Sequence, residues 1–213
     1  MITQIYEVSN ESEVALCVDA GINHIGILVG DGSFPRELTL LEARKLFDGL
    51  PDGTIGSALS LSADRALIET IIAVVSPRLL HLGAAPEALG LDVVQDIKAA
   101  HPGISLMRSI PVVDESAIDL AWAYDGVADF LLLDSHTPGD KQIGALGLTH
   151  DWAISRQIVG AVAIPCILAG GLGPDNVAAA IQAVSPAGVD SKTRTDITGQ
   201  HDKDPDKVRL FAE

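Results

Sequence analysis

The stretch CILAGGLGPDNVAAAIQAVSPAGVD, residues 166–190, contains a complete β-α-β pattern. Cys166–Ala169 is short, apolar and followed by two glycines, which is typical of a buried strand. Residues 176–184 carry apolar side chains at helical spacing and follow Asp175, a residue type that caps helices. A second apolar run, Ala187–Asp190, comes next. The stretch therefore predicts two parallel strands joined by a helix.

The same pattern recurs along the whole chain. Short runs rich in Val, Ile and Leu alternate with amphipathic segments, and eight such pairs can be drawn. Eight strands and eight helices can close into a ring, whereas an open sheet of that size leaves two edges to protect. We therefore predict an α/β fold, a (β/α)8 TIM barrel, with residues 1–213 in a single domain. The predicted strands are Ile2–Tyr6, His24–Val29, Thr54–Leu59, Arg78–Leu82, Ser105–Ile110, Phe130–Leu133, Cys166–Ala169 and Ala187–Asp190.

Several helix starts carry capping residues. Ser12, Thr39, Ser62 and Asp175 each stand directly before or close to an amphipathic run, and we predict them as N-caps. The last helix is predicted from about Asp204 to Phe211.

Composition limits the class of function. Hydrophobic residues make up 47% and aromatic residues 4%, so the core is expected to consist of Ala, Val, Ile and Leu, as in parallel sheets buried on both faces. Acidic side chains number 29 against 14 basic ones, and the formal charge of -15 repels polyphosphate. We therefore expect no nucleic-acid partner.

The sequence predicts a cytoplasmic protein without a membrane partner. No apolar run reaches the roughly 18 residues that span a bilayer, and the N-terminus has no basic segment followed by an apolar one. Cys17 and Cys166 have no CxxC spacing, so we expect packed side chains and neither a disulfide nor a metal site.

In a barrel of this type, the chemistry lies where strands end and βα loops begin. Polar residues gather at the ends of the first, second, sixth, seventh and eighth predicted strands. Gly170 and Gly171 follow the seventh strand, where backbone N–H groups can approach a phosphate and a helix N-terminus favours negative charge. The alternative is a tight turn that needs positive φ.

The sequence resembles the phosphoribosylanthranilate isomerases of tryptophan biosynthesis. Leu168–Val177 matches the family's LAGGL, two residues, then NV, and Gly188–Asp190 matches its GVD. GALGLTHDW at 144–152 is similar to the family's GGTG, one residue, then TFDW. Phe34–Arg36 resembles its Ser-Pro-Arg, and Lys203–Asp204 its Lys-Asp before the last helix.

The resemblance implies an Amadori rearrangement, in which the ring of an aminoaldose phosphate opens and a 1-amino-1-deoxyketose phosphate forms. This aldose-ketose isomerisation, an intramolecular oxidoreduction, needs an acid at the ring oxygen and a base at C2. It implies no metal and no organic cofactor. The expected partner is a small phosphorylated or carboxylated substrate. A homodimer is possible, and the sequence does not decide this question.

The family's acid is an Asp at the end of the sixth strand, a place that Asp134 takes here. An apolar surround is expected to raise the pKa of this carboxyl, so that it holds a proton near neutral pH. The alternative for Asp134 is a helix cap or an ion pair with Lys141.

The sequence differs from the family motif at the position of the catalytic base. Where the family has Lys-Ile-Cys-Gly, this chain reads Gln4–Glu7, so Tyr6 replaces the catalytic cysteine. Strand alternation points Tyr6 into the barrel mouth. Glu7 replaces a glycine and can reach the rim, but alternation points it outward, so we do not assign it as the base. A phenol, with a free pKa of about 10, is a poorer base than a thiol at about 8.5 unless cations lower its pKa. We predict Tyr6 or an unidentified group near the base position.

Cations follow the last strand in this acidic chain. Lys192 and Arg194 stand where the family uses Ser-Gly amides, and they can bind an oxyanion by a point charge and a fork. The alternative is that Lys192 and Arg194 pair with Asp190 and Asp196 on a solvated loop. Separately, residues 194–204 are expected to form a mobile loop that can act as a lid. The candidate anion-binding residues are Arg36, Gly170, Gly171, Asp190, Ser191, Lys192, Thr193 and Arg194.

Two functions remain open from the sequence. The first is an isomerase of a phosphorylated aminosugar with Asp134 as general acid. The second is a family relative that acts on, or only binds, a different sugar phosphate or small anionic ligand.

Overall fold

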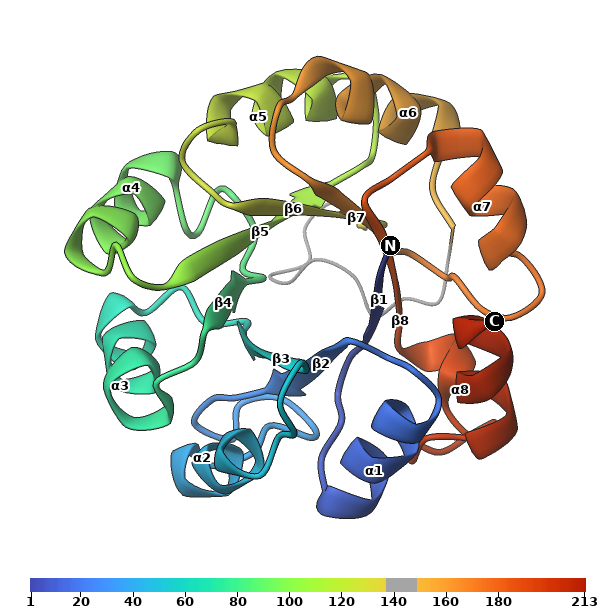
Figure 1. The fold of residues 1–213 in the computed structure, drawn as a ribbon. Coiled ribbons are helices and arrows are strands. Elements are labelled where there is room, and N and C mark those ends of the chain that lie inside the picture. The colour runs from blue at the N-terminus through green and yellow to red at the C-terminus, as the bar shows by residue number, and fades with distance from the viewer. Residues whose placement is uncertain (137–148) are drawn as a thin grey trace.

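The chain folds into a closed barrel of eight parallel strands surrounded by helices (Figure 1). The computed structural model describes residues 1–136 and 149–213. Each strand pairs with its neighbours in chain order, and β1 pairs with β8 to close the ring. The strands are β1 (Ile2–Ile5), β2 (His24–Leu28), β3 (Ile55–Ser60), β4 (Leu79–Leu82), β5 (Ser105–Pro111), β6 (Phe130–Asp134), β7 (Cys166–Leu168) and β8 (Gly188–Ser191).

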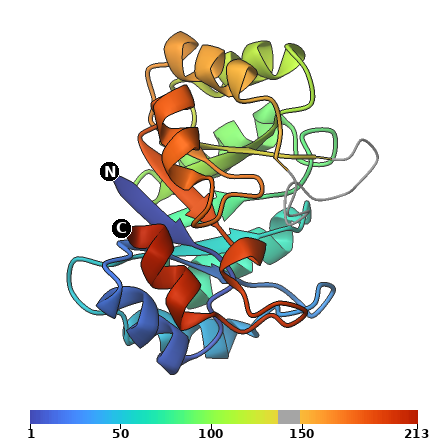
Figure 2. The same ribbon diagram turned by 90° about the vertical axis from the view of Figure 1, so that its right-hand side faces the viewer.

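The TIM-barrel prediction is confirmed, and each predicted strand overlaps an observed one. In Figure 2 the N-terminus lies at one end of the barrel, and the red loop that follows β8 extends at the opposite end. The helices are α1 (Glu11–Asp19), α2 (Leu40–Asp48), α3 (Arg65–Val75), α4 (Leu91–Ala100), α5 (Ser116–Tyr124), α6 (Trp152–Ala161), α7 (Val177–Val184), α8 (Pro205–Ala212) and the short 3-10 helix η1 (Thr193–Thr195).

Two predicted helix starts are confirmed. Thr39 caps α2 in a reciprocal arrangement with Glu42, in which each side chain bonds the other residue's backbone N–H. Asp204 caps α8 by accepting hydrogen bonds from the backbone N–H groups of Asp206 and Lys207.

Three predicted caps are wrong because a neighbouring polar residue takes the position. Asn10, not Ser12, caps α1. Asp64, not Ser62, caps α3, and the Ser62 hydroxyl instead accepts a hydrogen bond from the Asp64 backbone N–H.

At α7 the N-cap position is Asn176 rather than Asp175. The Asp175 carboxylate instead binds the Arg194 guanidinium.

Two layers of apolar packing hold the barrel together. The larger lies between the sheet and the helices, and its buried residues are mostly Ile, Val, Leu and Ala, as composition predicted. Cys17 and Cys166 are buried and unbridged, and burial raises the pKa of each thiol to about 12. The smaller layer fills the barrel interior with Tyr6, Leu79, Met107, Leu132, Ile167 and Ala169. No helix in residues 1–136 or 149–213 is long and apolar enough to cross a membrane.

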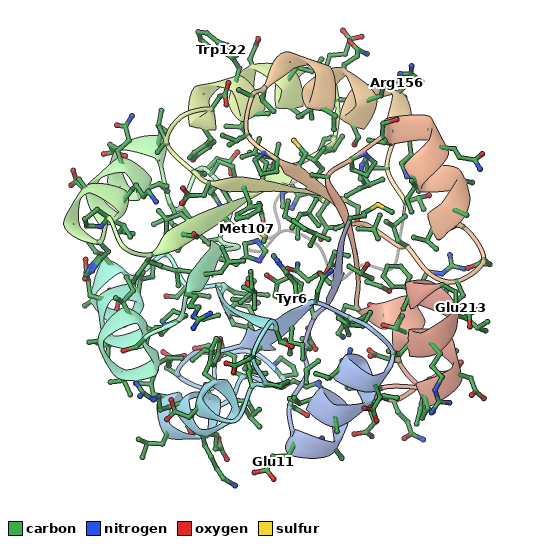
Figure 3. All side chains as sticks on the ribbon, in the orientation of Figure 1. Tyr6, Glu11, Met107, Trp122, Arg156 and Glu213 are labelled. Carbon is green, nitrogen blue, oxygen red and sulfur yellow. The ribbon has the colours of Figure 1, made fainter. Side chains whose placement is uncertain are left out.

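The interior depends on a close fit between Tyr6 and Gly26. Tyr6 lies near the centre of the barrel, as does Met107 (Figure 3). A Cβ atom at Gly26 would lie 2.0 Å from Cδ1 of the Tyr6 ring, well inside van der Waals contact. Gly26 is therefore the residue of β2 that makes room for the phenol ring.

We expect Gly26→Ala to lower the free energy of unfolding by about 1–3 kcal/mol or more, since the added methyl overlaps the Tyr6 ring. Gly160→Ala in α6 is the control, because a Cβ there meets nothing within 4 Å. Urea unfolding measures both. A Tyr6→Ala background should remove most of the Gly26→Ala cost, and equal costs in the two backgrounds would contradict the overlap.

Candidate functional site

A cavity of about 250 Å³ opens at the carboxyl ends of the strands, and we call it the main cavity. One wall is apolar and comes from β2, β3, β6 and the loops that follow β2 and β3. It consists of Leu28, Phe34, Pro35, Leu59, Leu61 and Leu132. The remaining lining is polar and consists of Tyr6, Glu7, His81, Ser109, Asp134, Asp190, Lys192 and His201.

A hydrogen-bonded chain lies on the floor of the main cavity. The Tyr6 hydroxyl lies 2.8 Å from Ser57 Oγ and 2.5 Å from Nδ1 of His81. Nε2 of His81 lies 2.7 Å from Ser109 Oγ. Burial, with a further contribution from the Arg108 charge, lowers the pKa of His81 to about 3, so the ring is neutral at pH 7. One ring nitrogen then accepts a hydrogen bond while the other donates one.

Tyr6 lies in the mouth, as strand alternation predicted, but its hydroxyl is occupied. Burial raises the pKa of the phenol well above its usual value, and the Asp190 charge adds to this effect. Tyr6 is therefore protonated near neutral pH, which favours hydrogen-bond donation and disfavours proton abstraction. Its catalytic role stays a prediction.

Asp134 ends β6 at the edge of the main cavity. Burial raises the pKa of its carboxyl to about 6, although hydrogen bonds from Ser135 act in the opposite direction. The Ser135 backbone N–H donates to Asp134 Oδ1 at 2.7 Å. Such a carboxyl can hold a proton near neutral pH, as the sequence predicts. Lys141, its alternative partner, lies outside the described residues.

Asp190, near the end of β8, is a second buried carboxyl in the same cavity. Its pKa is raised well above the usual range by burial and by the charge of Asp134. Gln4 Nε2 donates to Asp190 Oδ1 at 3.1 Å. The negative charge of Asp134 therefore disfavours ionisation of Asp190.

Glu7 is the cavity residue whose direction the sequence predicts wrongly. Strand β1 ends at Ile5, so the alternation that would point Glu7 outward no longer applies. Glu7 has φ 57°, in the left-handed region that non-glycine residues rarely adopt, and its side chain lines the main cavity. The one available signal was that Glu7 replaces a glycine of the family motif.

Cations hold the Glu7 carboxylate from two sides. Lys192 Nζ lies 3.2 Å from Glu7 Oε2, and Arg36 Nε lies 3.6 Å from the same oxygen. Arg36 also donates to the Glu7 backbone carbonyl and lies 3.6 Å from Oε2 of Glu13. Phe34 and Pro35 line the main cavity, whereas the Arg36 guanidinium is turned toward these acidic partners.

A small cavity of about 30 Å³ lies beside the main one and brings together the other predicted anion-binding residues. Gly170 and Gly171 have φ of 81° and 60°, so the turn that requires positive φ is present. The Ser191 hydroxyl donates to the carbonyl of Leu172. The lining consists of Asp134, Gly170, Gly171, Leu172, Asp190, Ser191, Lys192, Thr193 and Arg194.

Lys192 and Arg194 both have acidic partners, but only one of the two matches the pairing expected from the sequence. Lys192 lies 3.7 Å from Asp196, so that expected pair is present. Arg194 binds both oxygens of Asp175 at 2.6 and 2.7 Å, and its expected pairing with Asp190 or Asp196 is wrong. Asp175, the residue before the N-cap of α7, lies close enough in space to bind the guanidinium instead.

The segment 194–204 is anchored at both ends. Asp196 and Lys203 form a buried ion pair at 2.6 Å. Lys203 also donates its backbone N–H to the buried Glu13 carboxylate. Asp196 and Lys203 are thereby joined to each other, and Lys203 to Glu13 of α1.

In the described part of the chain, no three His, Cys, Asp or Glu side chains group in a way that could hold a metal ion. The carboxyl groups at this site lie beside lysine and histidine and can transfer protons.

We expect the free energy of unfolding to fall as pH rises from about 4 to about 7. Asp134 has a pKa of about 6 when folded and about 3.9 when unfolded, so the folded state binds more protons in this window and loses up to about 3 kcal/mol across it. Asp134→Asn should flatten the profile, and it also removes a charge that raises the pKa of Asp190.

Urea unfolding at a series of pH values measures this effect. Asp206→Asn, at an exposed position of α8, is the control and should keep the wild-type slope. An unchanged slope in Asp134→Asn would contradict a raised pKa at that carboxyl.

A family model and individual relatives with similar sequences carry the same family name. The family described as N-(5'phosphoribosyl)anthranilate (PRA) isomerase matches residues 87–213. A Methanocella arvoryzae N-(5'-phosphoribosyl)anthranilate isomerase is 35% identical over 198 residues, covering 92% of this chain and 89% of the relative. The Haloferax volcanii protein of the same name is 37% identical over 210 residues, covering 96% and 88%.

Solved structures share the fold. The Thermotoga maritima phosphoribosyl anthranilate isomerase superimposes with a TM-score of 0.80 at 23% identity, covering 99% of this chain and 97% of that one. A phosphoribosyl anthranilate isomerase in complex with reduced 1-(o-carboxyphenylamino)-1-deoxyribulose 5-phosphate gives 0.77 at 20% identity, covering 100% and 97%. With the matches in sequence, these findings show that the chain belongs to the N-(5'-phosphoribosyl)anthranilate isomerase family.

Proposed function

We propose that this chain is the isomerase that converts N-(5'-phosphoribosyl)anthranilate into its 1-amino-1-deoxyketose phosphate, with Asp134 as general acid. Family membership supports the reaction class. The observation that carries the proposal is a carboxyl with a pKa of about 6 at the end of β6, at the edge of the main cavity. Such a group donates a proton efficiently near neutral pH.

In this proposal the Asp134 proton passes to the ring oxygen of the sugar as the bond from that oxygen to C1 breaks. Nitrogen donates its electron pair to C1, and an open-chain iminium forms. Removal of the proton from C2 then gives an enolamine, which tautomerises to the ketose. Asp134 recovers a proton from solvent before the next turnover.

The substrate's phosphate is proposed to lie at the small cavity. Gly170 and Gly171 carry no Cβ, and Lys192 and Arg194 supply positive charge at the same place. Ser191 and Thr193 line this cavity with Asp190, whereas Arg36 lines neither this cavity nor the main one.

A homodimer stays a prediction for this chain. A Thermotoga maritima phosphoribosylanthranilate isomerase is described as dimeric, and that statement concerns the relative.

We expect Asp134→Asn to reduce kcat by about 10²–10⁴-fold, since the amide cannot donate the proton. Turnover of N-(5'-phosphoribosyl)anthranilate is followed by chromatography of the product. The reduced deoxyribulose phosphate analogue should bind the variant within about threefold of wild type, because the carboxyl acts on the reaction. A wild-type protein that leaves this substrate unchanged would contradict the proposed function.

We expect Lys192→Met to weaken binding of the same analogue by about 10- to 100-fold, the range for a lost charge-assisted hydrogen bond. Calorimetric titration measures the affinity. Arg209→Met on α8 is the matched control, since its guanidinium pairs with exposed Asp206. Equal affinity in Lys192→Met and wild type would contradict the placement of the phosphate.

A further inference from the structure

The main cavity contains a proposed acid, but the residue at the family's base position is not suited to accept the C2 proton. Tyr6 replaces the family's cysteine, and its hydroxyl is held by Ser57 and His81 with the phenol protonated near neutral pH. Building on the proposed function, we propose that Glu7 is the general base that removes the C2 proton. This assignment gives a catalytic role to a residue that strand alternation would have placed outside the mouth.

The backbone of Glu7 is the first observation in support. Glu7 adopts φ 57°, a conformation that costs free energy for any residue with a Cβ atom and is normally left to glycine. This conformation accompanies a side chain that lines the main cavity, with 12% of its surface exposed. Such strain persists where the surroundings hold it in place, and it concentrates at functional sites.

The surroundings of Glu7 provide that support through a closed circuit of alternating charge. Glu7 contacts Lys192 and Arg36. Lys192 continues to Asp196, and Arg36 continues to Glu13. Lys203 closes the circuit, because its ammonium binds Asp196 and its backbone N–H binds Glu13. These six residues, Glu7, Lys192, Asp196, Lys203, Glu13 and Arg36, form what we call the charge circuit.

The charge circuit orients the Glu7 carboxylate. Lys192 and Arg36 both approach Oε2 of Glu7. Among the contacts of the described residues, Oε1 is therefore the oxygen left to accept a proton. A carboxylate held in one geometry removes a proton from carbon more readily than one that must first be oriented.

The position of Glu7 relative to Asp134 suits the two proton transfers. Glu7 follows β1 and Asp134 ends β6, so the two carboxyls reach the same cavity from different sides. In the sugar, C1 is bonded both to the ring oxygen and to C2, so the atom that gains a proton and the carbon that loses one flank C1. An acid and a base from different strands can therefore serve both atoms of one bound molecule.

The step balances without a further reactant. The C2 proton moves to Glu7 Oε1, the electron pair of the C–H bond becomes the C1=C2 double bond, and the iminium nitrogen recovers its electron pair. The protonated Glu7 can return its proton to C1 as the enol hydroxyl loses one to water. Glu7 then ends the cycle as the carboxylate that began it.

The test uses two variants of Glu7. Glu7→Gln keeps the shape of the side chain, and Glu7→Gly relieves the left-handed backbone while it deletes the carboxylate. We expect both to fold and both to lose 100-fold or more in kcat on N-(5'-phosphoribosyl)anthranilate, with analogue affinity within about threefold of wild type. Added formate should restore part of the rate in Glu7→Gly, since a small carboxylate can occupy the vacated place.

Glu11→Gln is the matched control, because Glu11 lies on α1 with its side chain 73% exposed. If the wild type turns the substrate over and either Glu7 variant keeps kcat within about tenfold of it, the assignment of Glu7 is overturned while the proposed function stands. A loss of analogue affinity equal to the loss of rate would also overturn the assignment, since Glu7 would then act in binding. Wild type that is inactive on this substrate would overturn the proposed function and this inference together.

Discussion

Closure of the barrel between β1 and β8 is the constraint on which the candidate site depends. Gln4 lies opposite Asp190 and Ile5 opposite Ser191, and the Tyr6 backbone N–H donates to the Ser191 carbonyl at 3.0 Å. The first and last strands are thereby fixed side by side, although the whole chain lies between them. In an open sheet with the same strand order, the residues that follow β1 and β8 would lie at opposite edges, too far apart to line one cavity.

Tyrosine at the family's cysteine position needs space for its ring and partners for its hydroxyl, and residues of β2, β3 and β4 provide them. The phenol ring needs space, which Gly26 on β2 provides by having no Cβ. Its buried hydroxyl needs partners, which Ser57 on β3 and His81 on β4 supply. Because His81 is neutral, this network adds no charge to the barrel interior. Tyr6 therefore shapes the floor of the cavity without adding a charge to it.

The sequence predicts the strands, the barrel and the place of Asp134, because apolar periodicity and parallel-strand ends are local properties that tertiary contacts reinforce. It fails where neighbouring polar residues compete, as Asn10 does with Ser12 and Asp64 with Ser62 for the helix caps. It also fails for Glu7, since alternation applies only to extended residues and the left-handed turn after β1 cannot be deduced from spacing.

The charge balance at the mouth determines how an anion can be recognised by so acidic a chain. The charge circuit contains three carboxylates and three cations, so its own net charge is zero, while the whole chain carries -15. Long-range attraction therefore cannot bring an anionic substrate to the cavity. In the proposed function, recognition arises at short range, where Lys192 would contact a phosphate oxygen beside Glu7 and Asp196. Because Lys192 also contacts Glu7, one residue would then both bind the anion and hold the proposed base in place.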